Sequence, residues 1–165
     1  MPEDRPAVVF DINVLINAVV GDDSDFPYLA QVPPTTSNAD ADCLSIAFDA
    51  DDFGVFVSPH IMENVARILG GAGLSATTIE AYVDAILDVV ETSGAEVLDP
   101  PRKVFDVADR EDNLILDLAV DCEATIVVSN DTDLTSISPW HSRVAVMRPR
   151  DFVGRTLQMR RGRRR

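Results

Sequence analysis

The chain has 165 residues, a formal net charge of −14 and 46% hydrophobic residues. This length fits one domain that buries about 70% of its unfolded surface, and the hydrophobic content excludes a disordered chain. No apolar run approaches the ~18 residues of a membrane span and no signal-peptide pattern opens the chain, so we expect a cytoplasmic protein with no membrane partner. Cys43 and Cys122 show neither CxxC spacing nor a disulfide framework, which agrees with a reducing compartment.

Charge is distributed unevenly along the chain. Residues 155–165 hold six arginines and no acid, so residues 1–154 carry a net charge of −20. We therefore expect a single domain over 1–154 and a basic, flexible tail over 155–165. A body this acidic repels phosphate backbones unless cations intervene, and it suits a divalent metal ion or a basic partner.

Strands and helices are predicted to alternate along the chain. The turn-rich composition of 21–42 indicates a surface loop, and Ser58 followed by Pro59 is typical of a helix start. The expected strands are 7–10, 53–57, 95–98, 125–128 and 144–147, and the expected helices begin near residues 12, 44, 59, 75 and 109, with a last helical turn over 149–153. This alternation predicts an α/β fold, a three-layer α/β/α sandwich around a central parallel sheet.

Carboxylates follow the two most apolar strands. Asp11 comes directly after 7–10, and Asp131 and Asp133 come after 125–128. Parallel strands joined by right-handed crossovers end at one sheet edge, where open α/β sheets bind their ligands. Asp11 alone could be explained as the cap of the helix that follows it. A cap does not require acids after a second strand, so we interpret Asp11, Asp131 and Asp133 as a ligand-binding site. Asp131 follows its strand sooner than Asp133, but either side chain is a possible ligand.

Two further acids lie in the first or second turn of predicted helices. Asp112 follows the expected N-cap Asp109, and Glu63 lies one turn past Ser58. Both acids have an alternative explanation without a ligand. Asp112, in a first turn, complements the helix dipole, and Glu63, further along its helix, is a solvated surface acid. The sequence alone does not place Asp112 or Glu63 relative to the strand ends.

Four segments in this order resemble the PIN-domain nucleases, especially the VapC-like toxin branch. The resemblance covers roughly 6–154, and the segments are Val8-Val9-Phe10-Asp11-Ile12-Asn13, Ser58-Pro-His-Ile-Met-Glu63, Asp109-Arg-Glu-Asp112-Asn113 and Ser129-Asn-Asp131-Thr-Asp133. The resemblance implies a PIN-like fold and an Mg²⁺- or Mn²⁺-dependent endoribonuclease. It also implies a type II toxin with a cognate antitoxin, for which we expect a basic segment, and we hypothesise a homodimer.

Roles are carried over from the resemblance to matching positions only. It implies that Asp11, Glu63, Asp112 and Asp131 are catalytic and metal-binding, with Asn13, Ser129 and Asp133 in support. Phosphodiester hydrolysis by one or two hard cations agrees with such oxygen ligands. From the charge distribution we hypothesise that the tail arginines bind RNA phosphates: Arg155, Arg160, Arg161, Arg163, Arg164 and Arg165.

Two other functions compete with this interpretation. The first is a phosphatase with Asp11 as nucleophile, as in haloacid-dehalogenase-like enzymes. That family has a second Asp where this chain has Asn13, and a lysine before its late acids, whereas Lys103 is the only lysine here. The second is a non-catalytic acidic interaction module, which has no need for four acids at these spacings.

Overall fold

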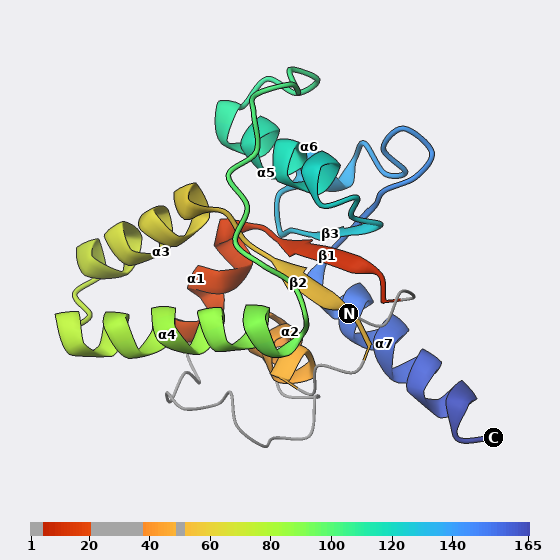
Figure 1. Cartoon of the computed structure of the whole chain (residues 1–165), viewed down its shortest axis with the longest axis horizontal. Helices are drawn as coiled ribbons and strands as arrows, with labels where there is room; N and C mark the ends of the chain where they lie inside the picture. The colour runs from red at the N-terminus through yellow and green to blue at the C-terminus, as the bar shows by residue number, and fades with distance from the viewer. Residues whose placement is uncertain (1–4, 21–37, 49–51) are drawn as a thin grey trace.

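The computed structural model describes residues 5–20, 38–48 and 52–165 (Figure 1). Within these residues a four-stranded sheet has the order β2-β1-β3-β4, and every strand pair is parallel. The strands are β1 (Ala7–Phe10), β2 (Gly54–Phe56), β3 (Ile126–Val128) and β4 (Ala145–Met147). Val9 lies opposite Phe56 on one side and Val127 on the other. The expected α/β fold with a parallel central sheet is therefore confirmed.

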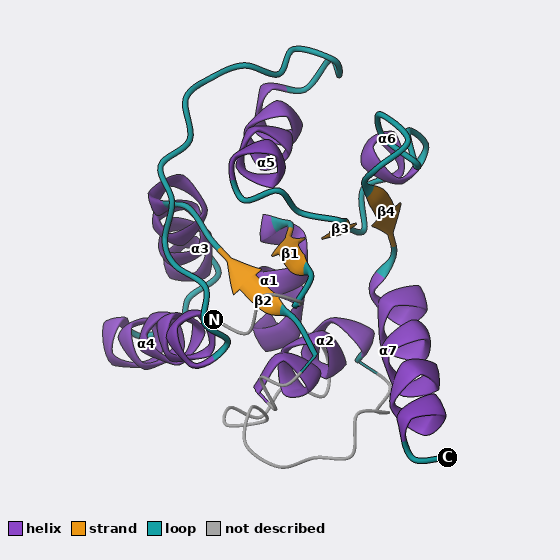
Figure 2. Ribbon diagram, turned by 45° about the vertical axis from the view of Figure 1, so that its right-hand side comes forward, coloured by secondary structure: helices purple, strands orange, loops and turns teal. Residues whose placement is uncertain are grey.

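Helices cover both faces of this sheet, which explains why the strands are apolar throughout. The helices are α1 (Ile12–Val20), α2 (Ala39–Phe48), α3 (Pro59–Gly71), α4 (Ala76–Thr92), α5 (Arg110–Asp121), α6 (Thr132–Thr135) and α7 (Pro149–Arg163). Figures 1 and 2 show α5 on one side of the sheet and α1, α2 and α7 on the other. Phe152 of α7 packs edge-on against Phe10 of β1, and Val8 and Val9 are fully buried. The expected sandwich is thus present, with its core on both sides of β1.

Local signals set where α3 and α5 begin. The side chain of Ser58 accepts a hydrogen bond of 3.1 Å from the Ile61 N–H, and Pro59 occupies the first helical position. Asp109 caps α5 by accepting a bond of 2.7 Å from the Glu111 N–H. Because α5 leads directly into β3, it runs back across the sheet and its first turn lies above the carboxyl ends of the strands.

Two expected elements differ from the structure. The strand expected at 95–98 is reduced to a single parallel bridge between Val57 and Val97, since Pro100 and Pro101 follow and have no N–H to continue a ladder. The helix expected near residue 44 begins earlier, at Ala39, because Asn38 accepts a hydrogen bond of 3.1 Å from the Ala41 N–H. The loop expected over 21–42 lies largely outside the described residues.

We expected a flexible tail over 155–165, and in the structure α7 continues to Arg163. Thr156 is buried in this extension, and two arginines bond the buried carboxylate of Asp52. Arg160 Nε lies 2.8 Å from Asp52 Oδ2, and Arg163 Nη1 lies 2.9 Å from Oδ1. Basic residues in the last turn also interact favourably with the helix dipole. The basic segment is therefore helical and pairs with the acidic body through Asp52.

None of the helices in the described part of the chain is both long enough and apolar enough to cross a membrane.

Candidate metal centre

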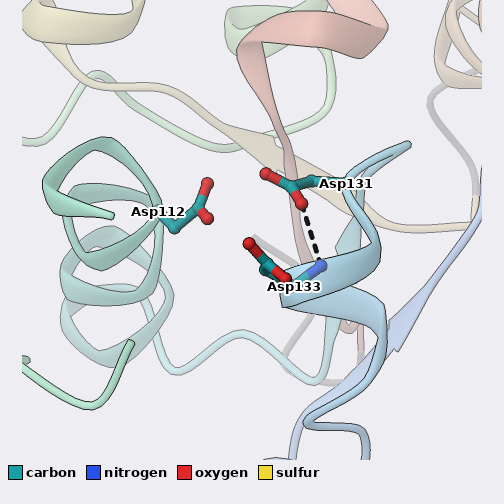
Figure 3. Close-up of side chains that lie close together, drawn as sticks. All are labelled: Asp112, Asp131 and Asp133. Carbon is teal, nitrogen blue, oxygen red and sulfur yellow. Dashed lines mark hydrogen bonds between the residues drawn. The ribbon is translucent and has the colours of Figure 1, made fainter. Parts of the chain in front are cut away.

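Three aspartates from two separate segments meet above the carboxyl ends of β1 and β3. One oxygen from each of Asp112, Asp131 and Asp133 lies within 4.8 Å of the others. Figure 3 shows Asp112 on α5 facing Asp131 and Asp133, which lie at the start of α6. The Asp133 N–H donates a bond of 2.9 Å to Asp131 Oδ1, which fixes Asp131 as the N-cap of α6. The resulting group combines a buried, a half-buried and an exposed carboxylate.

Asp112 is the only buried member of this three-aspartate group. Its side chain is buried, and its Oδ2 atom has no hydrogen-bond partner among the residues that the structure describes. Burial raises the pKa of Asp112 to about 7, and the nearby charges of Asp131 and Asp11 act in the same direction. A buried, unpartnered carboxylate oxygen facing two other acids is an unfavourable arrangement in the absence of a cation.

Asp11 lies beside the group and is held by three donors. Ser129 Oγ donates a bond of 2.6 Å and Asn13 Nδ2 one of 3.0 Å to Oδ2, while the Ile12 N–H donates one of 2.7 Å to Oδ1. Burial raises the pKa of Asp11, the charge of Asp131 acts in the same direction, and the hydrogen bonds from Ser129, Ile12 and Asn13 oppose the rise. These bonds fix the orientation of the carboxylate at the end of β1.

Ser129 and Asn13 also connect the end of β1 to the turn that carries Asp131. Ser129 Oγ accepts a bond of 2.9 Å from the Asp131 N–H, and Asn13 Oδ1 accepts one of 3.1 Å from the Asn130 N–H. Ser129, directly after β3, and Asn13, in the first turn of α1, thus both contact the acidic site. Their supporting role in catalysis stays a prediction.

Sequence reasoning missed the next residue in this network, Asp40. Asn130 Nδ2 donates a bond of 2.6 Å to Asp40 Oδ1 at the start of α2. Burial raises the pKa of Asp40, and the bond from Asn130 opposes that rise. The sequence holds no signal for this contact, because 90 positions separate the two residues and the turn-rich composition around Asp40 indicates a loop.

Glu63 is not part of the three-aspartate group. Its side chain is exposed on α3, a helix that begins at the carboxyl end of β2 and therefore at the same sheet edge. The side chains that connect α3 to α5 near this edge are His60, through Nε2, and Glu111, through Oε2. The role of Glu63 as a metal ligand stays a prediction.

Two of the tail arginines, Arg160 and Arg163, are bound away from the acids. Asp52, which binds Arg160 and Arg163, lies just before the amino end of β2, whereas the acids follow carboxyl ends. Sequence reasoning overlooked a nearer cation, Arg148, which follows β4. Its guanidinium donates bonds of 3.1 Å to the Asn130 carbonyl and to Thr132 Oγ1. Arg148 lies in the segment Met147-Arg-Pro-Arg-Asp-Phe152, which closes the family resemblance, but the sequence gave this arginine no role.

The donor set fits a divalent metal ion. Carboxylate oxygens are the ligands that Mg²⁺ and Mn²⁺ favour, and the unpartnered Asp112 Oδ2 offers one that is already desolvated. Asp131 and Asp133 add oxygens from the opposite side of the gap, as Figure 3 shows. A cation at this position would offset the repulsion that raises the pKa of Asp112.

Comparison with known proteins agrees with this geometry. No curated protein gives a significant match to the chain. The PIN domain family matches residues 7–133, a span that contains β1 to β3, the first two residues of α6 and all three clustered aspartates. PIN domains are typically metal-dependent nucleases, so the match and the aspartate group both indicate a nuclease with a metal site. The chain belongs to the PIN domain family.

Proposed function

We propose that this PIN domain is an Mg²⁺- or Mn²⁺-dependent endoribonuclease. The observation that carries the proposal is the group of Asp112, Asp131 and Asp133, with the buried Oδ2 of Asp112 left without a partner in the described residues. Family membership supports phosphodiester hydrolysis. RNA as the substrate and an internal cleavage position follow from the resemblance to the VapC-like branch.

We propose two roles for the residues of this site: some would bind the metal ion, and others surround these ligands. Asp112, Asp131 and Asp133 would hold the cation, and Asp11, oriented by Ser129 and Asn13, lies close enough to raise the pKa of Asp112. A bound divalent cation supplies an activated water and offsets charge on the phosphate. Because Asp133 is exposed, the substrate reaches the group from its side of the gap.

The competing functions receive less support from the geometry. A haloacid-dehalogenase-like phosphatase needs a lysine near its nucleophile, but Lys103 lines a separate cavity with Val120 and Trp140 near the other end of α5. A non-catalytic acidic interaction module for a basic partner gives no reason for Asp112 to be buried beside Asp131, since solvated acids are the less costly arrangement.

A toxin function belongs to this proposal as well. It would place the protein in the cytoplasm with an antitoxin whose basic segment binds the acidic edge, where the exposed Asp133 is accessible. A homodimer is the assembly we propose for the toxin. Expression in a bacterial host, with and without a candidate antitoxin, tests the toxin function. Growth arrest that the antitoxin relieves is the expected result.

The nuclease is tested with labelled single-stranded RNA, the matching DNA and a generic phosphomonoester. We expect RNA cleavage with Mn²⁺ and none with EDTA or with Asp112→Asn. Asp121→Asn, at the exposed far end of α5, is the matched control and should cleave like the parent. Metal-independent cleavage, or hydrolysis of the monoester alone, would contradict the proposal.

A further inference from the structure

Arg148 is the cation that bonds the acid-bearing turn. It lies between β4 and Pro149, the first residue of α7, and its side chain is exposed. Its Nη1 donates to the Asn130 carbonyl and its Nη2 donates to Thr132 Oγ1, each at 3.1 Å. Thr132 is the residue between Asp131 and Asp133, so the guanidinium is held on the turn that carries two members of the three-aspartate group.

Arg148 differs from the paired arginines on α7. Arg150 lies 3.3 Å from Asp42, and Arg160 and Arg163 bind Asp52. Among the described residues, Arg148 forms an ion pair with none of the three clustered aspartates, although it contacts the turn that holds two of them. Its positive charge is therefore available to a ligand that approaches the acidic edge.

The donor geometry of Arg148 suits a phosphate. A guanidinium has five N–H groups, and the two bonds to the turn leave the remaining donors without a partner within the described chain. Its planar fork matches two oxygens of a phosphodiester, and the existing bonds restrict its orientation before a ligand arrives. Less side-chain entropy is then lost when the ligand binds.

We propose that Arg148 binds a backbone phosphate of single-stranded RNA next to the phosphate that is cleaved. The inference rests on the proposed nuclease function and adds a substrate-binding residue that lies beyond the residues matched by the family, 7–133. A cation on the turn that carries Asp131 and Asp133 also offsets part of the repulsion between the acidic body and a polyanion.

A merely structural role makes a different prediction. If Arg148 only braces the turn, its removal displaces Asp131 and Asp133 and weakens metal binding. If it binds phosphate, metal binding persists and RNA affinity falls. Binding is therefore measured separately for RNA and for Mn²⁺.

The RNA measurement uses full-length protein with Asp112→Asn, which prevents cleavage, and a fluorescent single-stranded RNA at several salt concentrations. Arg148→Gln should weaken binding by about tenfold and reduce the log–log salt slope by ~0.7. Arg148→Lys should retain part of the affinity. Arg143→Gln removes the same charge from an exposed residue before the amino end of β4, and should change binding little.

The metal measurement uses the chain with Asp112 intact. Arg148→Gln should keep the full Mn²⁺-induced rise in thermal midpoint. Unchanged RNA affinity and salt slope in Arg148→Gln would overturn the inference while leaving the nuclease proposal intact if the parent cleaves RNA. Absence of the Mn²⁺-induced rise in this variant would overturn it in favour of a brace. A parent that neither binds nor cleaves RNA would overturn both.

Discussion

Ser129 donates a hydrogen bond of 2.6 Å to the carboxylate of Asp11, although 118 positions separate the two residues. The bond joins the ends of β1 and β3 and places Asp11 beside the turn that carries Asp131. The same hydroxyl oxygen accepts from the Asp131 N–H at 2.9 Å. The Ser129 side chain therefore orients both the Asp11 carboxylate and the turn that carries Asp131.

Replacement of Ser129 by alanine should lower the free energy of unfolding by about 1–3 kcal/mol, because a buried carboxylate and a backbone N–H are both left without this partner. Chemical denaturation at pH 8 measures this change. Ser136→Ala, which removes an exposed hydroxyl at the end of α6, is the control and should cost far less. Equal decreases in the two variants would show that the Asp11 contact is not the cause.

Asp112→Asn should stabilise the metal-free protein at pH 8 and abolish its response to Mn²⁺. The substitution removes a charge that burial and two neighbouring acids disfavour, and it also removes a ligand. In the parent, free metal at 100 times its Kd should contribute ~2.7 kcal/mol. Thermal melts with EDTA and with Mn²⁺ test both effects, and a parent with identical midpoints would exclude the metal centre.

The pKa of about 7 for Asp112, against an ordinary value of 3.8, fixes the sign of a pH dependence. Because the folded state holds this proton more tightly, its contribution to stability is fully present below about pH 4 and is lost as pH rises to about 7. Metal-free melts between pH 4 and 9 should show this decrease, and Asp112→Asn should show a smaller one, because the raised pKa values of Asp11 and Asp40 contribute a decrease of the same sign.

Metal affinity should change with pH in the opposite direction, since the cation must displace the proton on Asp112. We expect the Kd for Mn²⁺ to fall as pH rises to about 7 and to level off above it. Calorimetric titrations across this range measure the change. A Kd independent of pH between 5.5 and 7 would contradict the involvement of Asp112.

Asp52→Asn should free the last turns of α7, because Asp52 binds both Arg160 and Arg163. Its side chain is buried, so we expect the free energy of unfolding to fall by about 1–3 kcal/mol and amide exchange over 156–163 to become faster. Asp88→Asn, on the exposed face of α4, is the control. Unchanged exchange in Asp52→Asn would show that the buried face of α7 orders the segment without the ion pairs.

The outer tail arginines Arg161, Arg164 and Arg165 give a separate test of RNA binding. Replacing all three by glutamine should reduce the log–log salt slope of RNA binding by up to ~0.7 for each phosphate that is no longer bound. The thermal midpoint should stay close to that of the parent, since these side chains are exposed and the described residues show no ion pair for them. An unchanged slope would limit the tail to its structural contact with Asp52.

The sequence alone predicted the alternation of strands and helices and the common edge of Asp11 and Asp131. Both follow from local rules: apolar runs such as Ile126–Val128 form buried strands, and parallel strands end together. The N-caps of α3 and α5 could also be predicted from the sequence, because Ser58 and Asp109 accept hydrogen bonds from N–H groups only two or three residues ahead.

Tertiary structure decided the rest, because those contacts join residues distant in sequence. The return of α5 across the sheet brings Asp112 to the acids, and the pairing of Arg160 with Asp52 turns an expected tail into helix. Arg148 reaches its place only when β4 pairs with β3, since this pairing sets its guanidinium against the Asn130 carbonyl. Charge patterns along the sequence report how many charges there are, whereas burial and pairing in the fold determine which of them remain available to a ligand.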